Sequence, residues 1–130
     1  MQNVKTSNGQ VDERYESSAF VMQAQSPIEN FAPGLKRQFL GFNNEIMAVR
    51  VWFELGAVGD LHKHPHTQVS YVESGQFDVT VGDETRTLGA GDSFFVASET
   101  MHGAVCKKAG VLIDVFTPMR EDFIAERKSS

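Results

Sequence analysis

The sequence has 130 residues, 41% hydrophobic and 22% charged, which is typical of one globular domain with a single packed core. Its formal net charge of -5 without a clustered basic surface excludes a nucleic-acid-binding protein, and no apolar run approaches the ~20 residues of a membrane span. The lone cysteine, Cys106, and the absence of a charged-then-apolar leader favour a cytoplasmic protein without nucleic-acid or membrane partners.

The first part of the chain is the least regular. Residues 1–18 are polar and aperiodic, and we expect a flexible arm. Residues 19–25, AFVMQAQ, are typical of a strand that stops at Ser26 and Pro27. We therefore expect an accessory strand segment over residues 19–34 and the main domain over residues 35–130.

The middle of the chain is a series of short strands separated by turn residues. Residues 46–55 alternate, so that Met47, Val49, Val51 and Phe53 share one face. Residues 67–74 and 76–82 flank Gly75, which predicts a hairpin there. Further strands are expected over residues 35–41, two within residues 85–97, and a last one over residues 110–117. This pattern predicts an all-β barrel or sandwich.

The end of the chain is typical of a short helix. Thr117 is a suitable N-cap, and Pro118 suits the first helical position, so a C-terminal helix is predicted from about residue 118. Glu121 and Asp122 favour the positive end of the helix dipole. The positive charge of Arg120 is unfavourable at this end of the dipole, which suggests another function for this side chain.

Three of the four histidines lie within five positions of one another. His62 and His64, two residues apart on a strand, point to the same face, and Gln68 can return to it on the next strand. His102 follows a Gly-marked turn. Any one of these histidines could be an exposed loop residue or a satisfied core residue, but the combination favours a metal site.

The same residues resemble the first cupin motif, G-x5-H-x-H-x3-E-x6-G. It reads here as Gly56, His62, His64, Gln68 and Gly75, with glutamine in place of glutamate. The second motif, G-x5-P-x-G-x2-H-x3-N, is matched only at Gly91 and His102; Ala97, Glu99 and Cys106 depart from it. The resemblance implies a single-domain double-stranded β-helix, or jelly-roll barrel. It also implies a homodimer in which residues 19–30 reach a partner subunit.

The resemblance further implies one divalent transition metal ion (Ni, Zn, Mn or Fe) held by His62, His64, Gln68 and His102. Four neutral ligands leave the charge of such an ion uncompensated, which favours Lewis-acid chemistry over oxygen activation by a 2-His-1-carboxylate centre. The alternative is that Gln68 only forms hydrogen bonds and that three histidines suffice.

On the strand over residues 110–117, Leu112, Asp114 and Phe116 share one face. An acid between apolar residues is costly to bury unless it is paired or takes part in chemistry. Asp114 and Arg120 therefore form either a structural ion pair or a general base beside a carboxylate-binding arginine.

The segments ETMHGAV and LIDVFTPMREDF, together with HKHPHTQVSYVESG, resemble pectin-degradation cupins of the KdgF type. That resemblance implies ring opening and tautomerisation of 4,5-unsaturated uronate monosaccharides from pectin or alginate breakdown to the linear keto form. It implies a small anionic sugar substrate and functional roles for Asp114, Arg120 and Phe116. Lys63 and Ser70 depart from the pattern, and Ser70 bears on which substrate is bound.

Three other functions stay open at this point: a non-enzymatic cupin that binds a sugar acid, a metal-dependent dioxygenase or isomerase of another substrate, and a metal-free barrel. Outside the candidate site, His66 is expected to be exposed and Cys106 to be a buried, small apolar residue.

Overall fold

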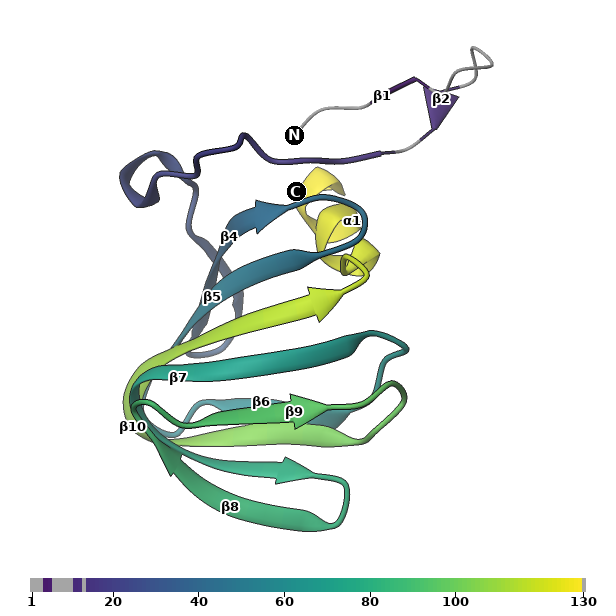
Figure 1. Cartoon of the computed structure of the whole chain (residues 1–130). Helices are drawn as coiled ribbons and strands as arrows, with labels where there is room; N and C mark the ends of the chain where they lie inside the picture. The colour runs from purple at the N-terminus through teal and green to yellow at the C-terminus, as the bar shows by residue number, and fades with distance from the viewer. Residues whose placement is uncertain (1–3, 6–10, 13, 130) are drawn as a thin grey trace.

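The computed structural model describes residues 4–5, 11–12 and 14–129, and it is a β-structure with one C-terminal helix (Figure 1). The strands are β1 (Val4–Lys5), β2 (Val11–Asp12), β3 (Glu29–Ala32), β4 (Leu35–Phe42), β5 (Met47–Phe53), β6 (Val58–His62), β7 (Thr67–Val81), β8 (Glu84–Gly89), β9 (Ser93–Val96) and β10 (His102–Thr117). A 3-10 turn, η1, spans Gln23–Gln25, and the helix α1 spans Glu121–Ser129.

Two long strands, β7 and β10, organise the barrel by pairing antiparallel along most of their length. The first half of β7 and the second half of β10 lie between β9 and β5, and β4 and β3 continue this layer. The second half of β7 and the first half of β10 lie between β8 and β6 in the other layer. Figure 1 shows both long strands running from one layer into the other. The predicted all-β jelly roll is therefore confirmed.

Gly75 marks the bend between the two layers and not a hairpin, so that part of the prediction is wrong. Residues 67–81 form one continuous strand, and Gly75 has φ +85° within it. A Cβ atom on Gly75 would overlap the backbone of Lys108 and Gly110 on β10. Glycine lets the two long strands approach closely where they bend.

The core lies between the layers and follows the alternation seen in the sequence. Met47, Val49, Val51 and Phe53 on β5 are buried, whereas the residues between them are half-exposed. Cys106 is buried among the core residues, as predicted. Burial of each large apolar side chain contributes about 1.5–3 kcal/mol, which makes this alternation the main determinant of the register of β5.

The segment before β4 differs from the sequence prediction. Residues 19–22 form no strand, Gln23–Gln25 form the turn η1, and β3 pairs with β4 of the same chain. The amide of Gln38 donates to the carbonyl oxygens of Gln23 and Ser26, both at 3.0 Å, and these bonds replace a strand partner.

Part of the predicted flexible arm is held against the barrel. Tyr15 is buried in the core, Glu16 forms a bridge with Asn43, and the Ser17 amide donates to the carbonyl of Phe42 at 2.8 Å. β1 and β2 pair with each other. Residues 1–3, 6–10 and 13, which belong to the same prediction, lie outside the described residues.

The helix α1 begins at Glu121, three residues later than predicted. Met119 is buried and its amide donates to the carbonyl of Asn44 at 3.0 Å, so the chain is still packed on the barrel at this point. The carbonyl of Arg120 accepts the first helical bond from Phe123, which places Arg120 just before the helix. Within the described part of the chain, no helix has the length and apolar character needed to cross a membrane.

Candidate metal centre and active site

The barrel brings three of the predicted ligands together. His62, the last residue of β6, and His102, the first of β10, are direct partners in the antiparallel register. His64 follows two residues after β6, and one potential ligand atom from each of the three histidines lies within 4.8 Å of the others. His64 and His102 are buried, and His62 is exposed. The three-histidine part of the predicted site is therefore present as a group able to hold a metal ion.

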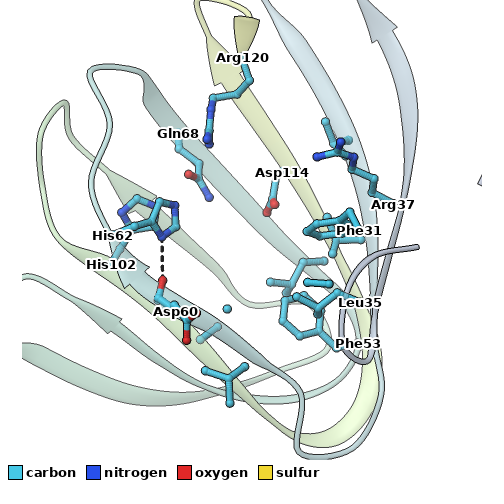
Figure 2. Close-up of a pocket in the computed structure, with 18 of the residues that line it drawn as sticks. Phe31, Leu35, Arg37, Phe53, Asp60, His62, Gln68, His102, Asp114 and Arg120 are labelled. Atoms are coloured by element: carbon cyan, nitrogen blue, oxygen red, sulfur yellow. Dashed lines mark hydrogen bonds between the residues drawn. The ribbon is translucent and has the colours of Figure 1, made fainter. Parts of the chain in front are cut away.

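The tautomers of these histidines suit a metal site. Each Nδ1 atom lies within hydrogen-bond distance of a backbone carbonyl oxygen and so carries the proton, which leaves the lone pair on Nε2. The acceptors for His62, His64 and His102 are the carbonyls of Asp60, His66 and Thr100, at 2.8, 3.0 and 2.8 Å (Figure 2 draws the first of these bonds).

Burial keeps two of the three histidines neutral. Burial, and then the nearby charge of Arg120, hold the pKa of His64 below its usual value. Burial is also the largest reason why the pKa of His102 falls to about 4. The Nε2 atom of His102 is buried without a hydrogen-bond partner among the described residues. An unprotonated, unpaired imidazole nitrogen facing two other imidazoles fits a metal ligand better than a core histidine.

Gln68, the second residue of β7, presents its amide oxygen to this group. Its Nε2 donates to Ser70 at 2.8 Å, and the Ser70 hydroxyl in turn donates to Asp114 at 2.6 Å. This network directs the Gln68 oxygen toward Nε2 of His64, 2.9 Å away. Because neutral His64 carries its proton on Nδ1, two acceptors face each other there, and a cation between them would satisfy both. The amide oxygen of Gln68 therefore points toward the histidine group.

His66 is buried, contrary to the prediction that it is exposed. Its Nε2 donates to the carbonyl of Met119 at 3.0 Å, and its own carbonyl accepts from His64. The loop after β6 is covered by the segment before α1, a contact between distant parts of the chain that local sequence does not reveal. His66 positions His64 and lies outside the group of three.

Asp114 lies on the inner face of β10, directly opposite Ser70 on β7 in the register. Desolvation by burial raises the pKa of Asp114 to about 6, while the Ser70 hydrogen bond and then the charge of Arg120 lower it. A carboxyl group with a pKa near neutrality, inside a cavity and linked through Ser70 and Gln68 to the histidines, is suited to moving protons.

Arg120 pairs with Asp122 and not with Asp114, so the interpretation as a structural Asp114–Arg120 ion pair is wrong. Its Nε and Nη2 atoms donate to the two carboxylate oxygens of Asp122 at 2.9 and 2.7 Å. The guanidinium carbon lies 5.1 Å from the ring centre of Phe116. The Phe116 ring is itself 5.8 Å from that of His64. Phe116 and Arg120 are therefore both close to the metal candidates.

One cavity of about 310 Å³ is lined by six of these residues: His62, Gln68, His102, Asp114, Phe116 and Arg120. Figure 2 shows its polar side, with His62, His102 and Gln68 on one wall and Asp114 between them and Phe31. The apolar side is formed by Phe31, Leu35, Val51, Phe53, Phe94, Leu112, Phe116 and Phe123, among others. A mostly apolar cavity of this size with a few converging polar groups is typical of a small-molecule site.

Sequence reasoning missed two polar residues of this site. Ser70 departs from the family pattern, but it is fully buried and links Gln68 to Asp114 through hydrogen bonds. Arg37 on β4 is buried and lines the cavity. The only signal for Arg37 is a charged residue between Leu35 and Phe39 on the same face of the strand.

Glu99 explains one departure from the second motif. It is the one non-glycine residue with positive φ (+62°) in the described part of the chain, and it stands where the motif has glycine. Its backbone amide donates to the carbonyl of His64 at 2.7 Å, so this strained turn links the segment before β10 to the loop after β6.

Comparison with known proteins agrees with the geometry. Residues 49–116 match the family model described as "Cupin domain". The chain is 38% identical over 107 residues to the pectin degradation protein KdgF of Dickeya dadantii, covering 81% of this chain and 97% of that protein.

Two solved structures are also similar. An RmlC-like cupin from Shewanella frigidimarina has a TM-score of 0.82 and 54% identity, over 83% of this chain and 97% of that one. KdgF from a Halomonas species has a TM-score of 0.78 and 37% identity, over 82% of this chain and 99% of that one.

Proposed function

The chain belongs to the cupin family and is a KdgF-like cupin, and from this and its cavity we propose that it opens 4,5-unsaturated uronate monosaccharides to their linear keto form. The observation that carries the proposal is Asp114, a carboxyl group with a pKa raised to about 6, on the wall of the cavity that is also lined by His62 and His102 of the three-histidine group. Such substrates arise when pectin or alginate is cleaved by elimination.

We propose that His62, His64, His102 and Gln68 hold one divalent transition metal ion, with Ni, Zn, Mn and Fe as candidates. The support is the shared orientation of the three imidazoles and the acceptor pair formed by His64 and Gln68. When bound, the ion would supply positive charge that binds sugar oxygens and stabilises developing negative charge on them.

Asp114 would move the proton. Ring opening removes the proton of the anomeric hydroxyl and breaks the bond between the anomeric carbon and the ring oxygen. The ring oxygen leaves as an enolate, which then gains a proton on carbon and becomes a ketone, so no atom is gained or lost overall. One carboxyl group with a pKa near 6 can accept the first proton and return it in the second step. The bond from Ser70 fixes which carboxylate oxygen stays free.

The positive groups of the cavity would favour an anionic substrate. Arg120 is held by Asp122 and lies against Phe116, so it adds a fixed positive charge close to Asp114 and His64. Phe116 and Phe123 provide apolar faces that exclude water from the reacting carbon.

We also propose that the protein is a homodimer. Phe20, Met22 and Ile28, in the segment before β3, expose large apolar side chains (83%, 58% and 53% exposed), which a second copy would cover. Sedimentation equilibrium should give twice the mass of the chain, and Phe20→Ser with Met22→Ser should shift it toward the monomer. A monomeric wild type would contradict the proposal.

The proposed reaction is tested with unsaturated uronate made by a lyase, by following the absorbance of the double bond. The wild-type protein should accelerate its loss above the spontaneous rate, without a requirement for oxygen. His102→Ala and Asp114→Asn should each remove most of the acceleration. If Asp114→Asn keeps full activity, the carboxyl group does not transfer the proton and the mechanism is wrong.

A further inference from the structure

Arg37 is a second arginine in the cavity, in addition to Arg120. It lies on β4 opposite Val51 in the register, with only 3% of its surface exposed, and it lines the cavity. In the view of Figure 2 the Asp114 carboxyl lies between Arg37 on one side and His62 and His102 on the other, with Arg120 above it.

The hydrogen-bond donors of Arg37 are only partly used. Nη2 donates to Glu126 at 2.9 Å, and Nε lies 3.5 Å from a carboxylate oxygen of Glu29. Nε and Nη1 have no hydrogen-bond partner among the described residues, although both atoms are buried. A buried, unpaired N–H of a cation costs more than a neutral one, so an arginine with spare donors in a cavity indicates a ligand.

Aromatic rings hold the Arg37 guanidinium in place. Its carbon lies 4.8 Å from the ring centre of Phe31, 5.4 Å from Phe39 and 4.6 Å from Phe123. These contacts fix the plane of the group and keep water away from it, which strengthens a bond to an anion. Glu126 and Glu29 lie outside the cavity lining, so their bonds leave the cavity side of the group available.

Arg120 differs in this respect. Its Nε and Nη2 atoms both donate to the carboxylate of Asp122, so this edge of the guanidinium is already occupied. Arg120 is therefore suited to supplying charge, and the unpaired Nη1 of Arg37 is better suited to receiving a further carboxylate.

We propose that Arg37 binds the carboxylate of a sugar acid, and that this subsite fixes the orientation of the substrate in the cavity. The identity of the sugar acid as an unsaturated uronate rests on the proposed function; the carboxylate subsite itself does not. With its acid end at Arg37, the substrate directs its hydroxyl-bearing carbons toward His62 and His102, across Asp114. Arg37 thus sets specificity for acidic over neutral sugars.

The test compares binding of galacturonate, which has no double bond to react, with binding of galactose to the metal-loaded protein. Affinities are measured by NMR titration for wild type, Arg37→Gln and Arg37→Lys. Loss of a buried, charge-assisted bond should reduce the preference for galacturonate by roughly 10- to 100-fold in Arg37→Gln, and by less in Arg37→Lys. Arg37→Lys retains a cation beside Glu29 and Glu126 and serves if Arg37→Gln does not fold.

Glu126→Gln is the matched control, because it removes the structural partner and leaves Arg37 itself intact. Glu126→Gln should keep the wild-type preference for galacturonate over galactose within about twofold, because the loss of a surface ion pair has only a small effect. The subsite is refuted if Arg37→Gln and Arg37→Lys both keep the preference, if Glu126→Gln loses it equally, or if wild type has none.

The same variants separate this inference from the proposed function. In the uronate-opening assay, Arg37→Lys should raise KM with a smaller change in kcat, because the bond is made to substrate and transition state alike. Failure of wild type to open unsaturated uronate overturns the proposed function, while the galacturonate comparison still decides the role of Arg37. An active wild type with unchanged KM in Arg37→Lys overturns the subsite alone.

Discussion

Replacing Asp114 with asparagine should stabilise the protein at neutral pH while removing its activity. The substitution keeps the size of the side chain and its oxygen, which can still accept the hydrogen bond from Ser70. It removes a negative charge that burial disfavours. Residues that serve chemistry at the expense of stability are expected at active sites.

The magnitude follows from the pKa of Asp114. Burial raises it from 3.8 to about 6 in the folded protein, so between these pH values the folded state binds more protons than the unfolded state. Wild-type stability therefore decreases as pH rises through this window. A difference of about two pKa units corresponds to about 3 kcal/mol at pH 7, which is the largest gain that Asp114→Asn should give. At pH 3.5 both forms are mostly protonated, and the gain should fall below about 0.5 kcal/mol.

Urea unfolding of the metal-free protein at pH 3.5 and pH 7 measures this difference. Asp78→Asn is the control, because Asp78 faces outward on β7 and also accepts a hydrogen bond, from Thr87 at 2.7 Å. It should change stability by less than about 0.5 kcal/mol at both pH values. Binding a divalent cation should reduce the gain of Asp114→Asn, because nearby positive charge favours the ionised carboxyl group.

The opposite outcome is an Asp114→Asn protein that is no more stable than wild type at pH 7 while Asp78→Asn behaves as expected. Such a result would mean that the carboxyl group is stabilised in its charged form in the folded protein, and a general base with a raised pKa would have to be given up. A gain of the same size at both pH values would assign the effect to packing instead of charge.

Three further predictions concern the site and its supports. His102→Ala should reduce the metal bound per chain, measured by elemental analysis, from about one ion to near zero, because a buried ligand is lost. If the variant binds as much metal as wild type, His102 is not a ligand. Ser70→Ala should move the acid limb of the pH–rate profile to higher pH, because the Ser70 bond lowers the pKa of Asp114; an unmoved limb would separate the two residues. Glu99→Gly should raise unfolding stability by up to about 1 kcal/mol by relieving its positive φ, whereas Ser98→Gly should lower it. Equal effects of these two glycine variants would contradict strain at Glu99.

The β-architecture could be predicted because it depends on local patterns. The alternation of Met47, Val49, Val51 and Phe53 defines an inner face, and the structure buries all four. Residues 67–81 were divided wrongly because glycine is as suitable for a bend where two strands cross as for a hairpin turn. The choice depends on β10, whose residues lie far away in the sequence.

The candidate metal ligands could be predicted for a different reason, because their spacing can be recognised in the sequence. His62 and His64 lie within one short segment, and His102 is their neighbour through the pairing of β6 and β10. The partners of Asp114 were not predictable in this way. Its bond to Ser70 comes from the register of β7 and β10, and Arg120 pairs with Asp122 because the helix starts after it.

Arg37 shows the limit most clearly. Its surroundings consist of a strand, the helix α1 and three aromatic rings that meet only in the folded barrel. Nothing in the segment LKRQFLG distinguishes it from the exposed Lys36 except its face of the strand.

The most direct test of the proposed function is the rate of uronate opening by one preparation before metal removal, after removal by a chelator and after reconstitution with a single divalent ion. Proton NMR of the product would identify the linear keto form. We expect acceleration above the spontaneous rate with metal, loss of it without metal and recovery on reconstitution. A rate that never exceeds the spontaneous one, or that is the same with and without metal, would contradict metal-dependent uronate opening.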